Sequence, residues 1–160
     1  MGFPFYVNEM KLFAIGENHL YQKAYTRGEK AASKTVVLYV LCDYAANRLQ
    51  KANPTKERLN RVGLTVTKKL GGAVIRNRTK RVLREGYRAV DRETPIKRGY
   101  LIVIVAREAA TKAKSTDIAR DLSDCMKKLG MLEGMAFPPK QKHAGKEQKP
   151  HKKAHRGEGK

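Results

Sequence analysis

A stripe of basic side chains lies in the stretch from residue 61 to 88, RVGLTVTKKLGGAVIRNRTKRVLREGYR. Four of them are spaced four apart, the spacing that places residues on one face of a helix: Arg76, Lys80, Arg84 and Arg88. Like charges at this spacing repel by roughly 0.2 to 0.5 kcal/mol per pair, and only Glu85 offsets them. A face that served only solubility would mix the two signs. Because arginine presents a permanently charged, planar fork of donors that fits phosphate oxygens, the stripe favours a polyanion-binding surface over a merely solvated one.

The same stretch predicts the elements that position this stripe. Val62, Leu64 and Val66 alternate with smaller and polar residues, as in a half-buried strand. The chain then turns at Gly71-Gly72 and continues as a helix. On the side of this helix away from the stripe we expect an apolar face: Ile75, Thr79, Val82, Leu83, Gly86 and Val90. Lys68 and Lys69, next to the turn, extend the basic surface.

Two further strands are predicted around this unit. Residues 35–43, TVVLYVLCD, are rich in β-branched and aromatic residues, and we expect them to pair antiparallel with the strand 61–68 across a long polar connection, residues 45–60. Residues 100–107, YLIVIVAR, are almost entirely apolar, which is typical of a central strand. Strand, helix and strand in one sheet imply a parallel crossover, for which general rules predict a right hand.

Helices are predicted near both ends of this unit. Asn18 is a candidate N-cap for a helix that Gly28 ends, and Tyr21 and Tyr25 lie four apart on it. These tyrosines fit either a core position or the rim of a groove where unpaired bases stack. Ser115 or Thr116 can cap a last helix that ends at Gly130 and buries an apolar face: Ile118, Leu122, Cys125, Met126 and Leu129.

The composition narrows the functional classes. The chain has 160 residues, a formal net charge of +20 and a sequence pI near 10.2, which fit one domain that works with nucleic acid. No apolar run approaches the roughly 20 residues of a membrane span, and we expect no membrane partner. The first residues, MGFPFYVNEMK, lack the pattern of a signal peptide, and Cys42 and Cys125 are expected to be reduced core residues, so the predicted location is the cytoplasm.

The C-terminal stretch differs from the rest of the chain. From Pro138 to Lys160 there are eight Lys or Arg against two Glu and no apolar periodicity, which predicts a disordered basic tail that contacts nucleic acid electrostatically. His151 and His155 have the spacing of a metal pair, but an unfolded tail is a poor setting for one.

The stretch from residue 66 to 88, VTKKLGGAVIRNRTKRVLREGYR, resembles the protein subunit of bacterial ribonuclease P, with Arg76-Asn77-Arg78 as the arginine-asparagine-arginine signature of that family. NHLYQKAYTRG, residues 18–28, agrees as well, with Tyr21 and Tyr25 in the places of two family aromatics. The resemblance spans roughly residues 15 to 133. The long connection 45–60, the first dozen residues and the tail depart from the family pattern.

This resemblance implies an α+β fold, a two-layer αβββαβα sandwich resembling the second domain of ribosomal protein S5. Its βαβ crossover would be left-handed, against the general rule, and a third short strand would lie between Gly28 and Ser33 or would split the long segment around it. The chain would divide into an N-terminal extension (residues 1–14), an RNA-binding domain (15–136) and a basic disordered tail (137–160).

The resemblance also implies the function. The chain would be the noncatalytic protein component of a ribonucleoprotein endoribonuclease, would bind ribonuclease P RNA in a 1:1 complex, and would bind the 5′ leader of precursor tRNA. The RNA subunit, with Mg²⁺, would hydrolyse the phosphodiester bond, and the protein would hold no cofactor, metal or catalytic residue. Contacts to the RNA subunit are expected at Lys68, Lys69, Arg76, Asn77, Arg78, Lys80, Arg81 and Arg84. Contacts to the leader are expected at Tyr21, Tyr25, Val36, Leu38 and Arg61.

Two alternatives belong to other classes. A ribosomal or RNA-chaperone protein with the same fold explains the charge and the tail equally well, but it leaves the context of Arg76-Asn77-Arg78 unexplained. A metal-dependent nuclease acting alone would need a general base or a metal cage, and the sequence offers no spacing for either.

Overall fold

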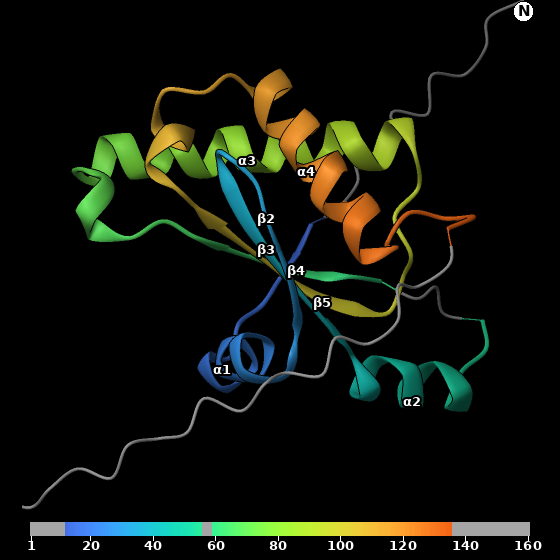
Figure 1. Cartoon of the computed structure of the whole chain (residues 1–160). Helices are drawn as coiled ribbons and strands as arrows, with labels where there is room; N and C mark the ends of the chain where they lie inside the picture. The colour runs from blue at the N-terminus through green and yellow to red at the C-terminus, as the bar shows by residue number, and fades with distance from the viewer. Residues whose placement is uncertain (1–11, 56–58, 136–160) are drawn as a thin grey trace, which may run out of the picture.

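A five-stranded sheet forms the middle of the computed structural model, which describes residues 12–55 and 59–135 (Figure 1). The strands are β1 (Phe13–Ala14), β2 (Glu29–Ala32), β3 (Val36–Cys42), β4 (Arg61–Thr65) and β5 (Tyr100–Ala106). The α-helices are α1 (Asn18–Arg27), α2 (Tyr44–Ala52), α3 (Ala73–Glu93) and α4 (Ser115–Leu129), and two short 3-10 helices are η1 (Lys68–Leu70) and η2 (Glu108–Thr111). The predicted α+β class is therefore confirmed.

The order of the strands corrects one prediction. The sheet runs β1-β4-β5-β3-β2, so β5 lies between β3 and β4, and these two do not pair with each other. Strand β3 is antiparallel to β5, while β4 is parallel to β5. The physical reason lies in β5, whose residues 101 to 104 are all buried and which therefore takes the central place. The third strand expected from the family resemblance is present as β2.

Helices cover both faces of the sheet. Apolar residues of α3 and α4 pack with one face, represented by Ile102 and Ile104, whereas Leu20 and Ala24 of α1 pack with Leu101 on the other (Figure 1). The sandwich therefore has a partial third layer, which the two-layer prediction did not include. Along each central strand, side chains point alternately to the face covered by α3 and α4 and to the face covered by α1.

The apolar face of α3 is mostly as predicted. Thr79, Val82, Leu83, Gly86 and Val90 are buried, and so are Tyr87 and Asp91, which the prediction did not include. A Cβ atom at Gly86 would lie 2.8 Å from Cγ2 of Ile118, so the missing side chain lets α3 and α4 approach closely. Ile75 is 44% exposed, contrary to the prediction.

Helix α2 replaces part of the predicted irregular connection 45–60. The Asp43 carboxylate accepts a hydrogen bond of 3.2 Å from the Ala46 amide and so caps the helix, which ends at Ala52, with Asn53 as its C-cap before Pro54. None of its residues is buried, so the sequence lacks the apolar period that predicts a helix.

The ends of the other helices and of the domain differ slightly from expectation. The N-caps are Glu17 rather than Asn18, and Lys114 rather than Ser115 or Thr116. Strand β1 pairs in parallel with β4, so residues 13 and 14 belong to the domain and not to the predicted extension 1–14. The rest of that extension, residues 1–11, and the predicted tail 137–160 lie outside the described residues.

Both cysteines are free, as predicted. Cys125 is buried in the core, whereas Cys42 is only half-buried. The expectation of two core cysteines therefore holds for Cys125 alone.

Candidate nucleic-acid interface

The turn before α3 aims the basic helix. Gly71 has φ +142°, in the region that favours glycine, and a Cβ atom there would lie 2.9 Å from Cδ1 of Ile75. The turn joins η1 directly to α3, so Lys68 and Lys69, both exposed, stand beside the first turn of the basic helix.

The predicted RNA-binding residues of α3 form one outward surface. Asn77, Arg78, Arg81 and Arg84 are exposed, and Arg76 and Lys80 are half-buried. The ion pairs of the described chain are His19–Glu17, Arg61–Asp43 and Arg98–Asp91, so none of them neutralises this surface. Its positive charge is therefore left for a partner outside the fold.

Two arginines of the signature differ in their surroundings. Nη1 of Arg78 donates a hydrogen bond of 2.8 Å to the carbonyl oxygen of Thr111, which ties α3 to η2. Nε of Arg76 is buried and has no acceptor within the described part of the chain. Arg78 thus serves the fold even though it lies on the exposed surface, while Arg76 retains an unmatched donor.

A groove with a volume of about 620 Å³ connects the basic surface of α3 to aromatic side chains. Its lining comes from α1, α3, β4 and the β1 segment: Leu12, Phe13, Ala14, Tyr21, Val62, Leu64, Lys80, Arg84 and Arg88. We call it the β1 groove. Partial burial, with a smaller contribution from nearby Tyr25, raises the pKa of Tyr21. Cations on one wall and aromatic rings on the other are the features that hold a single nucleic-acid strand.

The two tyrosines of α1 lie against the sheet and remain half-buried. A Cβ atom at Gly63 would lie 2.5 Å from the ring of Tyr21, so the glycine lets this ring lie close to β4. The hydroxyls of Tyr25 and Thr65 are 3.1 Å apart and share a hydrogen bond, and the rings of Tyr25 and Tyr39 meet edge to face with centroids 5.0 Å apart. Both tyrosines therefore contribute to packing and remain partly exposed, but of the two only Tyr21 lines the β1 groove.

The structure corrects two of the predicted leader contacts. Val36 and Leu38 are 0% exposed and belong to the core beneath α3 and α4, so they cannot line a surface cleft. The alternate residues of β3, including Tyr39, face the side of α1 instead. The prediction expected Val36 and Leu38 on the face of the sheet that carries the cleft, whereas they point to the opposite face. Because side chains alternate along a strand, the neighbouring residues point to the cleft face instead.

Arg61 is held by an ion pair. Its Nη2 lies 2.7 Å from Oδ2 of Asp43, and its Nε donates to the same oxygen at 2.8 Å. The Arg61 side chain is 30% exposed, whereas the Asp43 side chain is 3% exposed. The sequence analysis missed three residues at this site: Asp43, Tyr39 and Thr65. Asp43 is a residue type that often precedes a helix, and Tyr39 alternates along its strand with the core residue Leu38, so both positions carried a usable signal.

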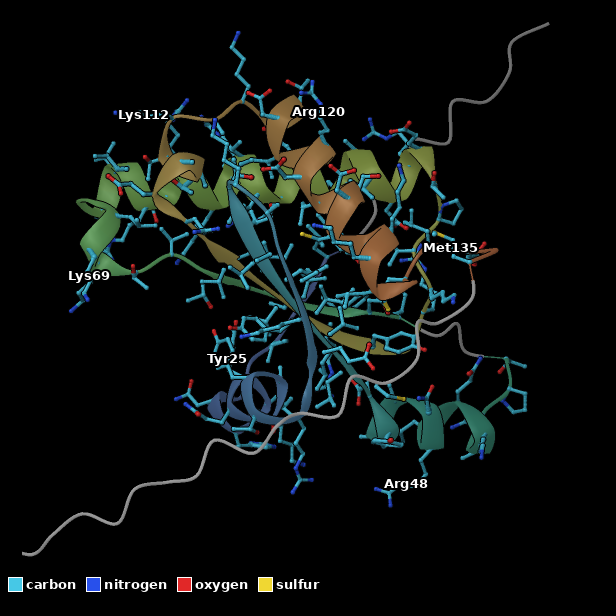
Figure 2. The ribbon with its side chains drawn as sticks, viewed as in Figure 1. Tyr25, Arg48, Lys69, Lys112, Arg120 and Met135 are labelled. Atoms are coloured by element: carbon cyan, nitrogen blue, oxygen red, sulfur yellow. The ribbon has the colours of Figure 1, made fainter. Side chains whose placement is uncertain are left out.

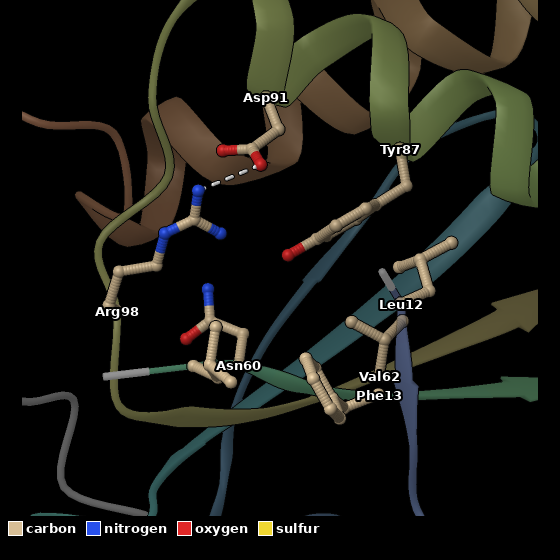
Figure 3. A pocket seen from close by; sticks show the side chains of 8 residues that line it. Leu12, Phe13, Asn60, Val62, Tyr87, Asp91 and Arg98 are labelled. Carbon is tan, nitrogen blue, oxygen red and sulfur yellow. Dashed lines mark hydrogen bonds and ion pairs between the residues drawn. The ribbon is translucent and has the colours of Figure 1, made fainter. Parts of the chain in front are cut away.

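A second, small cavity of about 30 Å³ lies beside the β1 groove (Figure 3). Asp91 accepts a hydrogen bond of 3.0 Å from Arg98 at its edge, and Asn60 donates to the Lys97 carbonyl and accepts from the Tyr100 amide. This volume suits a single water, and the polar groups here join α3 to the chain before β4 and β5.

Other site classes have little support in this part of the chain. Residues 12–55 and 59–135 contain no group of three or more His, Cys, Asp or Glu side chains placed to hold a metal ion. Among the same residues, no helix is both long and apolar enough to cross a membrane.

Comparison with known proteins identifies the family. The family model described as Ribonuclease P matches residues 11–130, which include the β1 groove and all of α3. The chain belongs to the ribonuclease P protein family. The resemblance inferred from the arginine-asparagine-arginine signature is thereby confirmed.

Individual family members agree over most of their length. A ribonuclease P protein component from Clostridium botulinum (strain 657 / Type Ba4) is 34% identical over 122 residues, which is 76% of this chain and 98% of that protein. The structure of the Staphylococcus aureus RNase P protein superimposes with a TM-score of 0.56 at 28% identity, covering 73% of this chain and 94% of that one. The RNase P protein from Thermotoga maritima, at 19% identity and a TM-score of 0.51, shares the fold over 71% of this chain and 93% of its own.

Proposed function

We propose that this protein is the protein component of ribonuclease P, that it binds the catalytic RNA and the 5′ leader of precursor tRNA, and that it assists removal of the leader. The observation that carries this proposal is the β1 groove, which is lined both by Lys80 and Arg84 of the basic surface and by Tyr21. The family membership supports the same assignment.

In this proposal the basic surface binds the RNA subunit through phosphates. The residues assigned to it are Lys68, Lys69, Arg76, Asn77, Arg78, Lys80, Arg81 and Arg84. Each phosphate contact releases a condensed counterion, which favours binding at low salt, and the positive charge offsets the repulsion between two RNA molecules. A donor such as the buried Nε of Arg76 would find an acceptor only if the side chain turned outward on binding.

The leader is assigned to the side of the sheet where α1 lies. Tyr21 and Tyr25 are half-buried against β4 and β3, and their remaining surface can stack on unpaired bases. A base stacked on an aromatic ring gains about 1 to 3 kcal/mol, which is large beside the screened attraction of one exposed cation. The leader would thus be held chiefly by stacking and the folded RNA chiefly by charge.

The chemistry is assigned to the RNA subunit and its Mg²⁺. The contribution of this chain is to position the substrate, because holding two reactants in line lowers the barrier of a reaction without any protein group entering it. We place the protein in the cytoplasm, in a 1:1 complex with its RNA. We also assign to it the S5-like sandwich with a left-handed β4–α3–β5 crossover.

Reconstitution tests the proposal. Purified protein is added to in vitro transcribed ribonuclease P RNA at low Mg²⁺ and low salt, and cleavage of precursor tRNA is followed by gel. We expect no cleavage with protein alone, slow cleavage with RNA alone and strong stimulation when both are present. A failure of the protein to stimulate this RNA would overturn the assignment.

A further inference from the structure

Helix α2 contributes no buried residue to the core of the described chain. The other α-helices of the described chain each bury at least two residues, whereas none of the residues of α2 is buried. It begins beside the first residue of β4, and Figure 2 shows Arg48 of α2 far from Lys69, which follows the other end of that strand. Hydrophobic packing therefore does not explain why this helix is present.

The start of α2 is nevertheless fixed to the domain. Asp43 caps the helix through the Ala46 amide and holds Arg61 at 2.7 Å, and the side-chain amide of Asn47 lies 3.2 Å from Sγ of Cys42. These contacts set the direction in which the helix leaves β3. A helix with a fixed direction and no core role presents its outer face at a defined place.

The outer face has a particular composition. Tyr44, Arg48 and Lys51 are all exposed and follow the spacing i, i+4, i+7, which places them within about 60° of one another around the helix. Tyr44 is 77% exposed, and the helix itself contains no acidic residue. The half-buried residues Ala46 and Asn47 lie on the opposite and lateral sides.

An aromatic ring followed by two cations along one helix face fits RNA better than it fits a protein groove. Leu49, 67% exposed, lies outside this stripe, so the stripe lacks the paired aliphatic anchors of a helix that docks into an apolar groove. A phosphate backbone matches the two cations, and an unpaired base matches the flat ring. The net charge of +20 favours the same partner.

We propose that the face of α2 formed by Tyr44, Arg48 and Lys51 is a second RNA-binding surface, separate from α3, in which the cations hold phosphates and Tyr44 stacks on an unpaired base. The proposal rests on the proposed function, because it takes the RNA from the same complex. We assign the unpaired RNA to the leader of precursor tRNA, because α2 begins beside Arg61, a predicted leader contact, and Arg48 of α2 lies far from Lys69, which is assigned to the RNA subunit.

The test compares full-length protein with the triple variant Tyr44→Ala/Arg48→Ala/Lys51→Ala. The charge-matched control is Arg120→Ala/Lys127→Ala, which removes two exposed cations from α4. Dissociation constants are measured between 50 and 200 mM salt for the RNA subunit alone and, in the reconstituted complex, for precursor tRNA with short and long leaders. Circular dichroism checks that each variant is folded.

Loss of two phosphate contacts should lower the salt slope by about 1.4 to 1.8, so the affinity of the triple variant should fall about tenfold less than that of the original chain across this salt range. We expect the change only for precursor tRNA with long leaders, and this result supports the proposal provided that the control leaves the slope unchanged. A change already seen with the RNA subunit alone would move the surface to that RNA and overturn the assignment to the leader.

Three further results would overturn the proposal. They are unchanged slopes with every RNA, an equal change in the control, and a shift in sedimentation that makes α2 a contact between protein copies. The original chain is measured in the same assays. If it fails to stimulate cleavage, the proposed function is wrong. If it stimulates cleavage but the triple variant binds every RNA as the original chain does, only the inference about α2 is wrong.

Discussion

Nη1 of Arg78 donates a hydrogen bond of 2.8 Å to the main-chain carbonyl of Thr111, although Arg78 belongs to the exposed basic surface. The bond joins the second turn of α3 to η2, which follows the central strand β5. Arg78 therefore combines a structural contact with a predicted RNA contact, and the two have to be separated by experiment.

We expect Arg78→Ala to lower the free energy of unfolding by about 0.5 to 1.5 kcal/mol, the net value of one hydrogen bond at a surface site, and also to weaken RNA binding. Arg81→Ala is the matched control, since Arg81 is exposed on the same helix and makes no hydrogen bond or ion pair in the described chain. Its unfolding free energy should change by less than about 0.5 kcal/mol, while its RNA salt slope falls by about 0.7 to 0.9. Urea titrations and binding curves measure the two effects, and equal stability of both variants would show that the Arg78 bond is not formed in solution.

Tyr21 tests the assignment of the leader. Tyr21→Ala should reduce affinity for precursor tRNA by about 1 to 3 kcal/mol if a base stacks on this ring, with little effect on mature tRNA. Tyr21→Phe keeps the ring and should keep most of the affinity. Because Tyr21 is half-buried over Gly63, the Ala variant also loses packing, so both substrates are measured on protein shown to be folded. Equal losses for the two tRNAs would return Tyr21 to a purely structural role.

The ion pair of Asp43 and Arg61 separates a structural role from a leader contact. Asp43→Asn keeps an N-cap side chain for α2 but removes the charge that holds Arg61 at 2.7 Å. Asp43 is 3% exposed and Arg61 is partly exposed. We therefore expect the free energy of unfolding of the variant to be about 1 to 3 kcal/mol lower than that of the original chain.

The matched variant Arg61→Ala leaves the Asp43 carboxylate buried and unpaired, so it should be at least as destabilising as Asp43→Asn. The affinity for the leader then separates a structural role of Arg61 from a leader contact. If Arg61 contacts the leader, Asp43→Asn should preserve or strengthen leader binding while Arg61→Ala weakens it. Parallel changes in leader affinity and stability for both variants would assign Arg61 to the fold alone.

The parts of the fold that sequence predicts best are those whose burial repeats locally. Val82, Leu83, Gly86 and Val90 of α3 follow the helical period because one side of the helix packs on the sheet and α4 throughout its middle. Ile75 breaks the pattern in the first turn of α3, where it is 44% exposed. A local period cannot show where the neighbouring elements end.

The errors concern relations between distant segments. The strand β5 separates β3 from β4, and nothing local in either strand states which neighbour it will pair with. Val36 and Tyr39 both fit a strand, but only the positions of α1, α3 and α4 decide which faces the deep core. Helix α2 was missed because it buries nothing, leaving the Asp43 cap as the main signal.

Tyr87 predicts how stability depends on pH. Burial is the main cause that raises the pKa of Tyr87 to about 12, against an ordinary value near 10. The folded chain thus holds this proton more tightly than the unfolded chain, so the stabilisation is complete below pH 10 and is lost as the pH rises towards 12. A shift of this size corresponds to about 2 to 3 kcal/mol. Urea titrations from pH 9 to 12 measure the free energy of unfolding of the original chain and of Tyr87→Phe. Because phenylalanine does not titrate, the original chain should lose this amount of stability relative to the variant over that range. A difference that stays constant would mean that the phenol ionises as readily in the fold as in water.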